Sequence, residues 1–265
     1  MKSDELPRIK SPTKLQRNEK INNHPKPFAE SPLKSTTINV EKVYHEVQKI
    51  LEQESKPHTA LDNFKSTKKF AEVLSKQLNK SKKLINILNS EKKHKRGEYY
   101  EKFLADVAHL LLNIEYYSSL SFSQKFALYK RFWQMFQLLL NCYQAYVCYG
   151  NDLTDMRYPI DNDHFIDLEK TITQDHNEAT LFLIPVLMKS KMLLIHIKKI
   201  CPTIFEFAYI CQVMLWSCAE IEELTGETCL LAEEMLQKAS DELHDYYVNE
   251  MHMHNYAARQ AELIV

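Results

Sequence analysis

The chain contains only three glycines in 265 residues, Gly97, Gly150 and Gly226. Average proteins hold about 7% glycine, and both tight hairpin turns and phosphate-cradling loops use it to reach positive φ or to let a ligand approach the backbone. This scarcity argues against a sheet protein and against a P-loop or dinucleotide-binding fold. Because 45% of the residues are apolar and can fill a core, the sequence predicts an all-α protein.

Apolar residues recur at helical spacing from Val40 onward. We expect an antiparallel bundle of about six to seven helices, preceded by a disordered basic tail and a long basic helical arm. Ser121 or Ser123 can cap one long helix that ends at Gly150, and Pro185 should kink a later one. The expected helical segments are residues 40–56, 60–96, 103–114, 122–149, 164–174, 178–200, 203–226 and 227–260.

Charge is sorted along the chain. Residues 1–96 hold 22 Lys and Arg against 11 Asp and Glu, whereas residues 97–265 hold 12 against 24. Residues 1–38 are rich in Pro, Lys, Asn and Ser and have little apolar periodicity, which predicts disorder. We therefore divide the chain into a disordered tail (1–38), a basic helical arm that could form a coiled coil (39–96) and an acidic helical bundle (97–265).

The basic arm has an acidic counterpart near the other end of the chain. Residues 65–96 carry a net charge of +9, and residues 220–250 carry −9. The two could dock antiparallel, within one chain or between protomers, or each could be a solvated face. A third alternative directs the basic run to duplex nucleic acid or an acidic membrane. The basic candidates are Lys65, Lys68, Lys69, Lys76, Lys80, Lys82, Lys83, Lys92, Lys93, Lys95 and Arg96.

Residues 132–151 carry no charge, and their length alone would permit a membrane span. However, Gln134, Gln137, Asn141 and Gln144 recur at helical spacing and form a polar stripe, which is typical of an amphipathic core helix. Neutral polar groups cost less to desolvate than charges. We therefore expect this stripe to be a second surface for protein contacts.

The tail holds two S-P-x-K motifs, at Ser11 and Ser31. They are similar to the consensus of proline-directed kinases, and phosphorylation would add about −1.5 to −2 charge at each. The alternative is that both arise by chance in a Lys-, Pro- and Ser-rich segment. We predict Ser11 and Ser31 as phosphorylation sites.

Two carboxylate–imidazole pairs lie one helical turn apart, Asp106 with His109 and Asp241 with His244. Helical di-metal sites prefer Glu-x-x-His and add further glutamates, so these pairs are expected to be solvated or salt-bridged boundary residues. None of the six cysteines forms a C-x-x-C pair, which with their apolar surroundings indicates a reducing compartment. We expect no catalytic residues, no metal and no cofactor.

Together these features predict a non-enzymatic adaptor or scaffold in a nuclear or cytosolic assembly. Its expected partners are other proteins, with a possible homo-oligomer through the helical arm. The alternative is a module that binds nucleic acid or an acidic membrane through residues 65–96.

Overall fold

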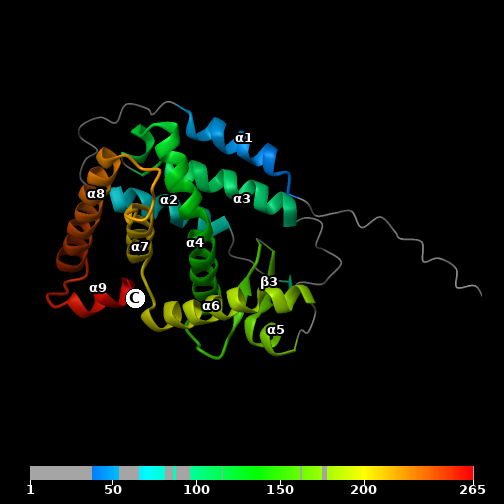
Figure 1. Ribbon diagram of the computed structural model, residues 1–265. Coiled ribbons are helices and arrows are strands. Elements are labelled where there is room, and N and C mark those ends of the chain that lie inside the picture. Colours follow the sequence, from blue (N-terminus) through cyan, green and yellow to red (C-terminus); the bar gives the residue numbers. More distant parts are fainter. Residues whose placement is uncertain are drawn as a thin grey trace, which may run out of the picture. The chain divides into compact units, whose positions relative to one another are not determined.

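The computed structural model describes residues 38–53, 66–80, 86–87, 96–114, 116–161, 163–174 and 178–264. All of them belong to one compact unit, shown in Figure 1. The α-helices among these residues are α1 (Val40–Leu51), α2 (Ser66–Lys80), α3 (Arg96–Leu111), α4 (Phe122–Tyr149), α5 (Leu168–Gln174), α6 (Glu178–Ile200), α7 (Ile204–Trp216), α8 (Gly226–Asp245) and α9 (Ala257–Ile264). The prediction of a mainly helical protein is confirmed.

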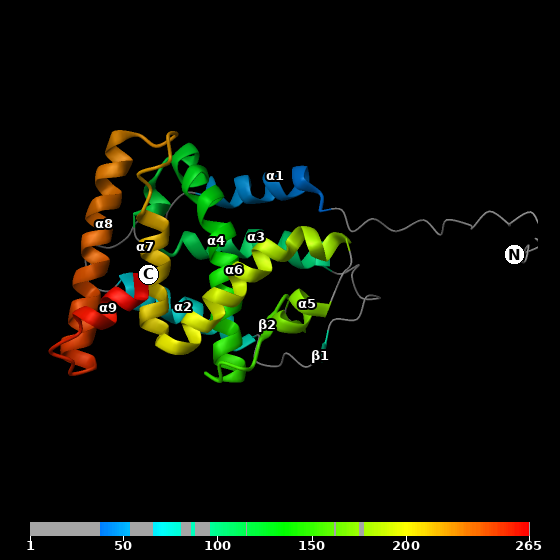
Figure 2. The same ribbon diagram turned by 60° about the horizontal axis from the view of Figure 1, so that its bottom comes forward.

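Helix α4 lies at the centre of this unit. It contacts α1, α3, α6 and α7, and its buried residues include Phe132 and Phe136. Helices α1, α3 and α6 run across the direction of α4, α7 and α8 in both views (Figures 1 and 2). The helices therefore cross in layers. Gly150 ends α4 with φ of 80°, a conformation that favours glycine, and this was the stop expected from the sequence.

Helix α2 is not part of a free basic arm. It packs against α7, and Phe70 and Leu74 are fully buried. The expected helix from 60 to 96 is also wrong, because Asn86 and Ile87 form a short strand.

The expectation of an all-α fold is wrong in one place, because three short strands form a sheet of order β1-β3-β2. Strand β1 (Asn86–Ile87) pairs parallel with β3 (His164–Asp167), which pairs antiparallel with β2 (Arg157–Pro159). The β2–β3 turn needs no glycine, because the Asp161 carboxylate accepts hydrogen bonds from the backbone N–H groups of Asp163 and His164. Aspartate side chains can close turns in this way.

The C-terminal helices are shorter than expected. Thr203 and Glu206 form a capping box at the start of α7, which ends at Trp216 rather than at Gly226. A separate helix, α8, then begins after Thr225. Thr225 is its N-cap, and its side chain accepts a hydrogen bond from the backbone N–H of Thr228. The expected helix 227–260 is interrupted after a π-helical turn (Tyr246–Glu250), where His252 has φ of 53°.

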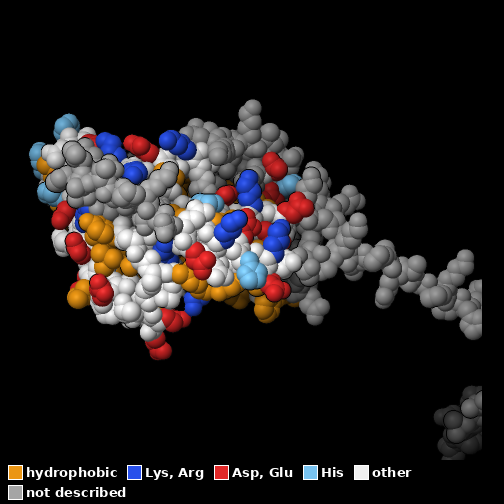
Figure 3. Space-filling view, turned by 90° about the horizontal axis from the view of Figure 1, so that it is seen from above, with side chains coloured by type: hydrophobic (Ala, Val, Ile, Leu, Met, Phe, Trp, Pro, Cys, Tyr) orange, Lys and Arg blue, Asp and Glu red, His pale blue; other side chains and the backbone are white. Residues whose placement is uncertain are grey.

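None of the described helices combines the length and the apolar character that a membrane span requires. On the face drawn in Figure 3, the described basic and acidic side chains are interspersed. The two charged segments meet where Lys68 Nζ of α2 lies 3.2 Å from Glu250 Oε1.

Candidate functional site

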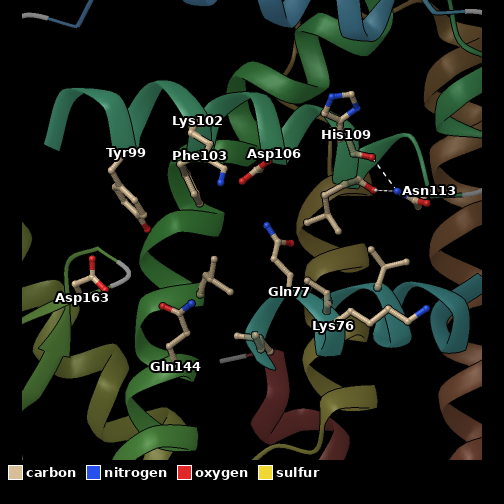
Figure 4. A pocket seen from close by; sticks show the side chains of 15 residues that line it. Lys76, Gln77, Tyr99, Lys102, Phe103, Asp106, His109, Asn113, Gln144 and Asp163 are labelled. Carbon is tan, nitrogen blue, oxygen red and sulfur yellow. Dashed lines mark hydrogen bonds between the residues drawn. The ribbon is translucent and has the colours of Figure 1, made fainter. Parts of the chain in front are cut away.

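A pocket of about 610 Å³ lies between α2, α3 and α4. Figure 4 shows its walls, with side chains from α2 and α3 facing one another across the space and α4 beside them. Ligand pockets in proteins commonly hold about 300–1,000 Å³. The cavity is therefore large enough for a small organic molecule.

The deep walls of the pocket are apolar. Each of the helices α2, α3 and α4 contributes buried aliphatic or aromatic side chains, because the stripes that face the core also line the cavity. These residues are Leu74, Leu78, Phe103, Leu110 and Leu140. Phe103 stacks on Phe136 of α4 with 6.4 Å between ring centroids, which fixes α3 against α4 at the pocket.

Polar side chains of α3 follow one face of the helix at intervals of three or four residues. Lys102, Asp106 and His109 all line the pocket, and Figure 4 shows Asp106 and, from α2, Gln77 directed into the space between the two helices. Asp106 is half-buried, while Lys102 and His109 are exposed at the rim. In the part of the chain that the structure describes, no salt bridge involves Lys102 or Asp106. Both charges are thus available to a bound molecule.

Tyr99 closes the end of the pocket nearest the sheet, opposite Asp163 (Figure 4). Burial raises the pKa of Tyr99, and the charges of Asp161 and Asp106 act in the same direction. The phenol therefore stays protonated at neutral pH and can donate a hydrogen bond.

The β2–β3 hairpin brings Asp163 to the pocket, and several contacts hold the hairpin in place. Arg157 of β2 lies over the Tyr149 ring of α4, 3.9 Å from its centroid. The buried Lys198 of α6 donates to the backbone carbonyls of Asp152 and Asp155, at 2.9 and 2.6 Å. These contacts make that end of the pocket a fixed wall.

Helix α2 forms the opposite wall, and its start is held by a side chain from far along the sequence. The Glu242 carboxylate of α8 accepts hydrogen bonds from the backbone N–H groups of Ser66 (3.0 Å) and Thr67 (2.7 Å). A carboxylate at a helix N-terminus satisfies otherwise unpaired N–H groups and interacts favourably with the helix dipole. Gln212 of α7 adds a hydrogen bond to the buried Thr67 hydroxyl at 2.9 Å.

The predicted basic candidates do not form one surface. Lys68 pairs with Glu250, Lys69 is exposed, and Lys76 lies at the rim of the pocket. Lys80 ends α2, and Arg96 begins α3. Lys65, Lys82, Lys83, Lys92, Lys93 and Lys95 lie outside the described residues, as do Ser11 and Ser31.

The polar stripe of α4 divides between solvent and interior. Gln134 is exposed and Gln137 is half-buried, whereas Asn141 is buried and donates to the Tyr158 hydroxyl at 3.4 Å. Gln144 is half-buried and lines the pocket. The end of the stripe nearest Gly150 thus lies at the pocket and the sheet.

Sequence reasoning did not single out Tyr99, Lys102 or Asp163, which all line the pocket. Asp106 and His109 were expected to be boundary residues; Asp106 is half-buried and His109 exposed, and both line the pocket. Their spacing of one helical turn was the available signal, yet it was tested only against metal sites. Among the described residues no group of three or more His, Cys, Asp or Glu side chains gathers in a metal-binding arrangement.

The comparison with known families identifies the class of protein. The model of the ligand-binding domain of nuclear hormone receptors matches residues 82–265. Because this match covers more than half of the chain, the chain belongs to that family. It is also similar to nuclear hormone receptor family member nhr-127 of Caenorhabditis elegans, with 22% identity over 266 residues that cover 93% of this chain and 72% of that protein.

Membership of this family corrects the expected function. The prediction of a simple adaptor or scaffold is wrong, because the family consists of ligand-regulated transcription factors. The matched description is of a ligand-binding domain, not of a module that binds nucleic acid or membranes through residues 65–96. The prediction that the chain is not an enzyme is confirmed by the same finding. Ligand-binding domains of this family bind protein partners, which agrees with the coarse expectation of protein contacts.

Proposed function

We propose that this chain is a ligand-sensing domain that binds a small amphipathic molecule in the pocket between α2, α3 and α4. The observation that carries the proposal is the cavity of about 610 Å³ whose apolar depth is combined with a few polar groups. Such a combination is what ligand sites generally show. The family model names a ligand-binding domain, which supports the same function.

The lining indicates how a ligand would be oriented. The hydrocarbon part would lie against buried residues such as Leu74, Phe103 and Leu140, since burial of apolar surface provides most of the binding free energy. A polar group would meet the side chains of Lys102 and Asp106 near the rim. The ligand would then contact α2, α3 and α4 together, so its binding would change how firmly these helices hold one another.

As part of this proposal we place the protein in the nucleus, where a ligand-regulated transcription factor acts. Protein partners would respond to the bound state of the domain. The expected homo-oligomer through residues 39–96 gains no support from α2, because its apolar stripe is covered by α7 of the same chain.

The experiment that tests the pocket uses 8-anilinonaphthalene-1-sulfonate, a fluorescent probe with an apolar body and an anionic group, and the full chain. Gln144→Trp would place a large side chain in the cavity, whereas Gln134→Trp adds the same ring at an exposed position of the same helix. We expect the pocket variant to bind the probe about tenfold more weakly and the control to bind like the wild type. Equal binding by all three proteins would refute the assignment of the pocket.

A further inference from the structure

A second cavity lies apart from the proposed ligand pocket and shares no lining residue with it. It holds about 420 Å³ and is bounded by Arg131 of α4, by Trp216 at the end of α7 with the residues after it, and by one face of α8. Residues 229, 232, 233 and 236 of α8 line it at helical spacing. The cavity therefore sits between three helices whose relative positions are fixed by the core.

Two residues that line this cavity each carry a hydrogen-bond donor without a partner in the described structure. Nη1 of Arg131 and Nε1 of Trp216 are both buried and make no hydrogen bond among the described residues. The whole Trp216 side chain is 1% exposed. Arg131 as a whole is half-buried, but buried donor atoms are normally satisfied. Two unsatisfied donors on residues that line one cavity indicate that something with acceptor atoms belongs there.

The acidic residues of the cavity do not satisfy these donors. Glu220 and Glu233 both line it, but both are exposed, and neither pairs with Arg131 in the described structure. The neighbouring cation behaves differently, because Lys130 forms a salt bridge with Glu223 at 2.9 Å. The charge of Arg131 also acts on Cys218, another residue that lines the cavity. Burial raises the pKa of the Cys218 thiol, and the positive charge of the Arg131 guanidinium opposes that effect.

The chemistry of the lining favours one class of ligand. A guanidinium presents a planar fork of N–H groups that matches the two oxygens of a carboxylate, and the indole N–H supplies a further donor. Ala232 and Leu236 offer apolar surface beside them. The two glutamates at the mouth would repel a multiply charged anion more than a singly charged one.

We propose that this cavity is a second binding site, in which Arg131 and Trp216 hold the carboxylate of a small organic monoanion and the α8 face covers its hydrocarbon part. The site is independent of the pocket between α2, α3 and α4. A ligand bound there would link α4 to α7 and α8, and so would stabilise the folded chain by mass action.

The protein carries its own reporter for this site, because Trp133 and Trp216 are its two tryptophans. In the full chain with Trp133→Phe, the emission comes from Trp216 alone. Titration with hexanoate should change this emission and reach saturation, whereas 1-hexanol, which has the same chain length and no charge, should not. If hexanoate causes no saturable change in the emission, the proposal is overturned. If 1-hexanol causes the same change as hexanoate, the proposed role of the carboxylate charge is overturned.

Variants of the two adjacent cations provide the matched comparison. Arg131→Gln should weaken hexanoate binding by about tenfold or more, and Arg131→Lys, which keeps the charge but loses the fork, should lie between it and the parent protein. Lys130→Gln should change the affinity by less than about twofold, since that lysine is exposed and paired elsewhere. Equal losses in the Lys130 and Arg131 variants would refute specific recognition, as would displacement of hexanoate by an equal concentration of inorganic phosphate.

A chemical readout remains usable if Arg131→Gln fails to fold, as judged by circular dichroism. Cys229 lines the cavity and is half-buried, while Cys148 and Cys201 are equally half-buried outside it. Hexanoate should slow the alkylation of Cys229 by iodoacetamide, measured by peptide mass spectrometry, and leave the other two unchanged. Unchanged labelling of Cys229 at saturating hexanoate would contradict the site.

Discussion

Replacing Glu206 by glutamine should destabilise the protein more than any surface substitution, because Glu206 holds three elements together. This side chain is 1% exposed. Its Oε1 lies 2.7 Å from Nε of Arg259 and accepts from the Tyr247 hydroxyl at 2.8 Å, while its Oε2 lies 2.8 Å from Nη2 of Arg259 and accepts from Thr203 N at 2.7 Å. The carboxylate therefore joins the start of α7 to the π-helical turn and to α9.

The expected magnitude follows from what the substitution leaves behind. Glutamine keeps the shape of Glu206 but removes the charge that compensates Arg259, and breaking a buried ion pair in this way costs about 3–5 kcal/mol. The Arg259 side chain is 23% exposed, so water can solvate part of the guanidinium. We therefore expect the free energy of unfolding to fall by about 3 kcal/mol, measured by urea denaturation followed by circular dichroism.

Acid should abolish this contribution. Burial alone would raise the pKa of Glu206, but the hydrogen bonds from Arg259, Thr203 N and Tyr247 together hold it below its usual value. A carboxylate with a lowered pKa stabilises the fold above its unfolded-state pKa of about 4.3, and this stabilisation is lost as the pH falls through the folded-state pKa. The difference in stability between the wild type and Glu206→Gln should accordingly shrink as the pH falls below about 5.

Two further proteins complete the test. Glu262→Gln removes a carboxylate from an exposed position of α9 and should change stability by less than about 0.5 kcal/mol. Adding Arg259→Met to Glu206→Gln should recover part of the loss, since the uncompensated charge is then gone. A cost below about 1 kcal/mol for Glu206→Gln, or full additivity in the double variant, would refute the reasoning that the pair is desolvated.

Two other substitutions test how the N-terminal helices are held. Lys125→Met removes the buried ammonium group that donates to the Leu51 carbonyl at 2.7 Å; we expect a loss of about 1–3 kcal/mol in urea denaturation, with faster hydrogen exchange in α1, and unchanged exchange there would contradict this role. Glu242→Ala removes the acceptor at the start of α2 and should cost about 1–2 kcal/mol in the same assay, whereas Glu234→Ala at an exposed position of α8 should be nearly neutral.

Helix positions could be predicted wherever the sequence carried both an apolar stripe and a local end signal. Gly150 and the Thr203–Glu206 capping box both act within one turn of the residues they affect, so they were visible in the sequence. The strand at Asn86–Ile87 was harder to predict, because the Lys-rich residues around it are compatible with an exposed helix. Its pairing with β3 depends on residues far along the sequence, so no local signal shows it.

The sheet and the pocket were missed for a different reason. The turn before His164 is closed by an aspartate side chain, so the scarcity of glycine did not exclude a hairpin. The pocket is formed by α2, α3, α4 and the β2–β3 hairpin, whose contributing residues range from Val73 to Asp163 in sequence. Periodicity shows which face of each helix is apolar, but it does not show which faces meet around a cavity.

The two N-terminal helices have ends that distant residues complete. At the end of α1, the Leu51 carbonyl accepts a hydrogen bond from Lys125. At the start of α2, the backbone N–H of Ser66 donates to Glu242, which lies 176 positions later. During synthesis, the α2 wall of the cavity therefore cannot be finished until α8 has left the ribosome, since vectorial folding can use only the chain that has emerged. Until α7 has also emerged, the apolar stripe of α2 that contains Phe70 and Leu74 stays exposed to water. Exposed apolar surface of this kind is what chaperones bind.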